Sequence, residues 1–70
     1  GALETFKPGD RVRVLRVHFA GNPSHDIMVG REGVVTKTVK SRAVVALKLD
    51  DGKLWEANPV NLVILASAAA

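Results

Sequence analysis

The strongest strand pattern in the chain is GVVTKTVKSRAVVALKLDDGKLW, at residues 33–55. Two runs within it, 33–38 and 43–49, each contain a pair of valines, and the first also contains threonines; the polar segment 39–42 separates them. Branched Cβ atoms restrict χ1 and pack well on a pleated surface, so these residues favour strands. We therefore expect an antiparallel hairpin over residues 33–49.

Side-chain alternation assigns the faces of this hairpin, because successive side chains on a strand point to opposite sides. Val45, Leu47 and Leu49 should therefore lie together on one face of the second strand. Val34 and Thr36 should lie together on one face of the first. The alternation thus places these two sets of side chains on different faces.

The segments after the hairpin add two more strands. The sequence DDGK at 50–53 predicts a tight turn, since an Asp-Gly pair between two strands favours a primed or bulged hairpin. A strand over 53–58, a short turn or 3₁₀ helix at 59–61 and a last strand over 62–65 complete the pattern.

The segment before the hairpin supplies the first strand, over 11–17, after a Pro-Gly-Asp turn at 8–10. Val12 and Val14 alternate with arginines, which predicts one apolar and one cationic face. Leu15 breaks the alternation, and this favours a bulge or a strong bend at that point.

A long polar segment, residues 18–28, connects the first strand to the second. Two glycines in the following run, 29–33, indicate a tight turn into the second strand. A loop of about ten residues in so small a domain is usually either functional or floppy.

The whole chain is one small all-β domain. Seventy residues leave no room for a second domain. Five short strands have to hide their edges, and closure into a barrel does so. The sequence therefore predicts a five-stranded SH3-like barrel over 6–65, with a long loop between strands 1 and 2. Residues 1–5 and 66–70 are expected to be flexible flanks. An OB-type barrel is the alternative, but it usually needs longer strands and a helix.

Several runs resemble the KOW and SH3-like barrel group. They are PGDRVRV at 8–14, GREGVV at 30–35 and AVVAL at 43–47, and LDDGKLW at 49–55 is similar to Tudor-like barrels. In KOW domains a Gly-x-x-Gly-x-Val turn leads into a hairpin. The resemblance implies a barrel that contacts RNA, DNA or protein.

The same pattern resembles three further barrels. They are the variable chain of ferredoxin–thioredoxin reductase, a small peripheral photosystem subunit and the barrel of the nitrile hydratase β chain. The first two are docking barrels. The loop at 18–28 departs from a minimal KOW motif, which is shorter there, so a docking function stays open.

The first functional hypothesis is a non-enzymatic module that contacts RNA or DNA phosphates within a larger protein or assembly. The formal net charge is +3 and the sequence pI is about 9.8, which favours an acidic partner. Backbone amides near Gly30 and Gly33 would assist. The candidate phosphate contacts are Arg11, Arg13, Arg16, Lys37, Lys40 and Arg42.

The alternative is a protein-docking barrel with an acidic protein partner, such as a small accessory subunit of an enzyme or electron-transfer complex. Its candidate contacts are His18, Phe19, His25 and Trp55. A single basic face would favour the first hypothesis. Cations paired with Glu32, Asp50 and Asp51 would favour docking. Three aromatic residues are too few for a methyl-lysine cage, a polyproline groove or a stacking platform.

Enzymatic and metal chemistry have little support. The chain has no cysteine, which excludes thiolate zinc sites, iron–sulfur ligation and disulfides within this sequence. His18 and His25 lack a third ligand at a recognised spacing, and a contiguous Ser-His-Asp run is no triad. We expect no catalytic residue, no metal, no cofactor, no small-molecule substrate and no membrane span. The expected location is a reducing intracellular compartment.

Overall fold

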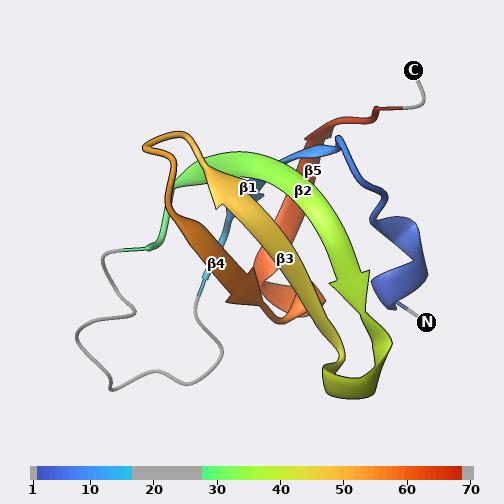
Figure 1. Cartoon of the computed structure of the whole chain (residues 1–70). Helices are drawn as coiled ribbons and strands as arrows, with labels where there is room; N and C mark the ends of the chain where they lie inside the picture. The colour runs from blue at the N-terminus through green and yellow to red at the C-terminus, as the bar shows by residue number, and fades with distance from the viewer. Residues whose placement is uncertain (1, 17–27, 69–70) are drawn as a thin grey trace.

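The computed structural model describes residues 2–16 and 28–68, and within them it is all-β with no α-helix. All strand pairings are antiparallel and form one sheet, in the order β4-β3-β2-β1-β5 (Figure 1). The predicted all-β class is confirmed. The strands are β1 (Arg11–Val14), β2 (Glu32–Val39), β3 (Val44–Leu49), β4 (Leu54–Ala57) and β5 (Leu62–Ala66), and the 3₁₀ helices are η1 (Ala2–Thr5), η2 (Lys40–Arg42) and η3 (Pro59–Asn61).

The sheet wraps around a single apolar core. Figure 1 shows β2 as a strongly curved strand, and the register of β2 against β3 shifts between Val35 and Lys37. Such a shift bends a strand and increases its twist. Ala57 of β4 and Leu62 of β5, at opposite ends of the strand order, belong to the same core cluster. The cluster comprises Phe6, Val12, Val14, Val35, Val45, Leu47, Leu49, Ala57 and Leu62.

The predicted closure into a barrel is not found in the hydrogen-bonding pattern. Within the described ranges, no ladder joins β4 to β5, so the sheet has two ends. The connection between these strands is η3, in which Asn58 Oδ1 accepts a hydrogen bond from Val60 N at 3.1 Å. β5 pairs with β1 rather than with β4. The chain therefore passes through η3 to reach the edge of β1 that β2 does not occupy. The sheet therefore curves around the core but is not closed.

The first strand is shorter than predicted. Its alternation is confirmed, with Val12 and Val14 buried and the arginines outside. The predicted bulge at Leu15 is wrong, because β1 ends at Val14 and the register shift lies between Arg11 and Val12, against β5. Leu15 lies beyond the end of β1 and is 49% exposed. It departs from the alternating pattern because it is not part of the strand.

The faces of the β2–β3 hairpin agree with the prediction. Val45, Leu47 and Leu49 are buried, whereas Val34 and Thr36 are exposed. The strand limits differ from the predicted ones by one residue, since β2 runs over Glu32–Val39 and β3 over Val44–Leu49. The connection that was expected to be a polar loop contains η2.

Two glycines have specific roles. Gly33 lies where β2 crosses β3, and an added Cβ would be 2.5 Å from the carbonyl oxygen of Lys48. Gly52 has a φ of +89° in the β3–β4 turn, where Leu49 N donates to Lys53 O at 2.8 Å. The predicted Asp-Gly turn is therefore confirmed.

Most of the predicted loop at 18–28 lies outside the described residues, which resume at Met28. Arg31 N donates to Met28 O at 3.0 Å, as expected for a turn before β2. None of the helices in the described ranges combines the length and apolar character that a bilayer span requires.

Candidate functional site

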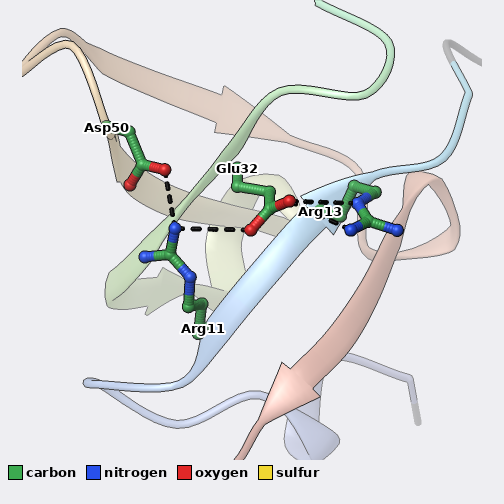
Figure 2. A network of polar contacts seen from close by, with 4 residues as sticks. All are labelled: Arg11, Arg13, Glu32 and Asp50. Atoms are coloured by element: carbon green, nitrogen blue, oxygen red, sulfur yellow. Dashed lines mark hydrogen bonds and ion pairs between the residues drawn. The ribbon is translucent and has the colours of Figure 1, made fainter.

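An ion-pair network lies on the outer face of β1 and β2 (Figure 2). Arg11 Nη2 donates to Asp50 Oδ2 at 2.6 Å and lies 3.3 Å from Glu32 Oε1. Arg13 donates to Glu32 Oε2 from Nη2 at 3.0 Å and from Nε at 3.3 Å. The strand register explains the arrangement, since Arg13 pairs with Glu32. Asp50 N also donates to Glu32 O at 3.0 Å, which holds the β3–β4 turn beside them.

The network neutralises the cationic face expected on β1. Two guanidinium groups meet two carboxylates, so its formal charge is zero. The hydrogen bond and the attraction to Asp50, and then Glu32, raise the pKa of Arg11. Arg11 and Arg13 therefore offer a phosphate much less attraction than unpaired arginines would.

Two further arginines are also paired. Arg42 donates to both oxygens of Glu56, at 2.6 and 2.8 Å, in the bidentate geometry that suits guanidinium and carboxylate. Arg31 Nη2 donates to Asp51 Oδ2 at 2.5 Å. The pKa of Asp51 is lowered, first by the hydrogen bond from Lys53 N and then by Arg31. Four of the arginines, Arg11, Arg13, Arg31 and Arg42, thus follow the paired pattern.

The remaining predicted phosphate contacts are exposed. Arg16, Lys37 and Lys40 form no ion pair with any residue in the described ranges. The amide of Gly30, proposed to assist phosphate binding, already donates to Val14 O at 2.8 Å. The two lysines line separate hollows.

One hollow, here called the β2–β4 hollow, lies on the sheet near Trp55 and has a volume of about 340 Å³. Trp55 is half-buried and packs against the core, while Leu54 beside it is 77% exposed. The lining residues are Thr36, Lys37, Ala46, Leu47, Leu54, Trp55 and Glu56. Of the residues predicted for protein docking, Trp55 is the one in the described ranges, and His18, Phe19 and His25 lie outside them.

The second hollow, here called the η1 hollow, has a volume of about 460 Å³. It joins η1 and the turn after it to the end of β2 and to η2, which Figure 1 shows near one another. Its lining residues are Leu3, Glu4, Phe6, Lys7, Thr38 and Lys40. The sequence analysis did not predict this site, because the two segments that line it, 3–7 and 38–40, are far apart in the chain.

Sequence reasoning also missed Asp10, a carboxylate only 2% exposed. Lys7 N donates to its Oδ2 at 3.0 Å, and Ala68 N donates to its Oδ1 at 2.8 Å. These bonds, that from Ala68 first, lower the pKa of Asp10. The Pro-Gly-Asp turn indicated the local bond, but nothing in the sequence indicates the partner 58 positions away. Through these two hydrogen bonds, Asp10 links the segment after β5 to the turn before β1.

In residues 2–16 and 28–68, histidine, cysteine, aspartate and glutamate nowhere form a group of three or more that could hold a metal ion. No family model matches the chain, and no curated protein matches it either.

Proposed function

We propose that this chain is a non-enzymatic binding module that docks a protein partner. The observation that carries the proposal is the pairing of Arg11, Arg13, Arg31 and Arg42 with carboxylates. Arginines that bind phosphates are expected to be unpaired in the free protein, because phosphate affinity comes from neutralising charge and releasing counterions. Paired arginines instead hold strands and turns together.

We also propose that the wrapped sheet is an SH3-like barrel. The strand order β4-β3-β2-β1-β5, the curved β2 and the short helix η3 before the last strand support this assignment. In this assignment η3 connects β4 to β5, the two end strands of the sheet. Because the core cluster fills the concave side of the sheet, the outer surface is left for function.

The docking face consists of Lys37, Ala46, Lys48 and Leu54. Leu54 is the most exposed of the large apolar residues in the described ranges. Trp55, the next residue, lies opposite the buried Leu47 and packs against the core, so it supports this face from behind. Lys48 pairs with Leu54 in the β3–β4 register, and neither Lys37 nor Lys48 has an ion pair among the described residues. An acidic partner with an apolar anchor would match this face.

Phosphate binding is the second candidate function. It is favoured by the formal net charge of +3 and by the exposed, unpaired Arg16, Lys37 and Lys40 in the described part of the chain. These side chains do not share one hollow, since Lys37 and Lys40 line different ones. This arrangement supports docking more strongly.

The test is affinity capture from native lysate, with and without nuclease, using the unchanged chain and two variants. Leu54→Ser removes the apolar anchor, and Val60→Ser is its control because Val60 is also exposed (42%) but lies on η3. We expect an acidic protein that survives nuclease treatment, is lost with Leu54→Ser and is kept with Val60→Ser. Capture that is lost on nuclease treatment, or that is unchanged by Leu54→Ser, would contradict the docking function.

A further inference from the structure

The η1 hollow lies on residues other than the docking face, so what it binds is separate from the proposed function. Its floor is apolar. Phe6 belongs to the core cluster and Leu3 packs against that cluster. Phe6 N donates to Leu3 O at 3.2 Å, which fixes the two residues relative to each other. The floor is therefore a preformed part of the protein.

The rim of the η1 hollow is polar and carries net positive charge. Lys7 and Lys40 are exposed, and neither forms an ion pair with another residue in the described ranges. Glu4 lies on the same rim, and the Thr38 hydroxyl is a further polar group. The two ammonium groups of these lysines attract an anion to the rim.

We infer that the η1 hollow binds the C-terminal carboxylate of a polypeptide that ends in a large aliphatic residue. In such a residue the carboxylate and the apolar side chain branch from the same Cα, so one group reaches Lys7 and Lys40 while the other covers Leu3 and Phe6. An internal Asp or Glu carries no apolar group beside its carboxylate. The volume of about 460 Å³ lies within the range of roughly 300–1,000 Å³ common for ligand sites.

The test is an NMR titration of the ¹⁵N-labelled full chain with acetyl-Gly-Gly-Leu bearing a free carboxylate. We expect saturable shifts at Leu3, Phe6, Lys7, Thr38 and Lys40, with a dissociation constant on the order of 1 mM. The same peptide with a C-terminal amide should produce no saturable shift. Equal binding of the amide, or shifts centred elsewhere, would overturn the inference.

Two further probes separate the possible sources of the anion. The peptide should bind more tightly than 4-methylpentanoate, which has a similar apolar group and a carboxylate but no peptide chain. It should also bind more tightly than inorganic phosphate. If either small anion binds as well as the peptide, the hollow is a small-anion site and the inference fails.

Variants complete the test. Lys7→Gln and Lys40→Gln should each weaken the peptide about two- to fivefold, as expected for an exposed charge pair. Lys53→Gln is the matched control, because Lys53 is an exposed lysine in the β3–β4 turn. Leu54→Ser should leave the peptide affinity unchanged, so failure of the docking face and failure of this site are distinguishable. Equal affinity in all four variants would overturn the assignment.

Discussion

Gly33 shows how a single residue controls the approach of two strands. Because an added Cβ would be 2.5 Å from Lys48 O, β2 or β3 has to move to accept any side chain there. We expect Gly33→Ala to lower the free energy of unfolding by about 1–3 kcal/mol, the usual cost of overpacking. Urea unfolding measures this, with the exposed Ser41→Ala as control. An unchanged urea midpoint would mean that β2 and β3 can move apart at this position without loss of stability.

Asp10 gives a pH-dependent prediction at the same scale. Its folded pKa is lowered by the N–H groups of Ala68 and Lys7, so the ionised carboxylate stabilises the folded state at neutral pH. This stabilisation starts to be lost as the pH falls below the unfolded value of about 3.9, and is gone below the folded pKa.

The measurement is the difference in unfolding free energy between the unchanged chain and Asp10→Asn. The variant has no charge and keeps only one of the two acceptor oxygens. We expect the unchanged chain to be more stable at pH 7, with the difference shrinking as the pH falls below about 4. A difference that stays constant down to pH 2 would show that the Asp10 charge contributes nothing.

At the scale of elements, the Arg42–Glu56 pair joins η2 to β4. Both side chains are substantially exposed, at 58% and 41%, so water and salt screen their attraction. A double-mutant cycle with Arg42→Ala and Glu56→Ala should give a coupling of about 0.2–1 kcal/mol, smaller in 1 M salt. A coupling well above this, or one insensitive to salt, would show that the pair is shielded from solvent.

The limits of sequence reasoning are clearest among the strands. Alternation predicted the buried faces of β1 and β3 because the two-residue period is local. It did not predict that β1 ends at Val14, since Leu15 is apolar yet exposed. It also missed the register shift between Val35 and Lys37, because registers depend on the partner strand. The pairing of Arg11 with Asp50, 39 positions apart, likewise depends on the sheet and not on the local sequence.

At the scale of the whole molecule, one core holds all five strands, and two leucines on neighbouring strands test it. Leu47 is buried in the core, whereas Leu54 is mostly exposed. Leu47→Ala should cost about 2–5 kcal/mol, a large part of the stability of so small a domain. Leu54→Ala should change the stability by less than about 0.5 kcal/mol. Thermal unfolding followed by circular dichroism compares them, and similar losses would contradict the assignment of the core.

The charge distribution of the whole molecule predicts how it responds to nucleic acid. Six phosphate contacts on duplex DNA would give a slope of log affinity against log salt of about −5, at about −0.9 per neutralised phosphate. Arg11, Arg13 and Arg42 are paired with carboxylates, which leaves Arg16, Lys37 and Lys40 of the predicted six. Those three would give a slope no steeper than about −3. Fluorescence anisotropy with a labelled duplex between 20 and ~200 mM salt measures it. A slope near −5 would mean that more cations than these three neutralise phosphates, and phosphate binding would then replace protein docking as the favoured function.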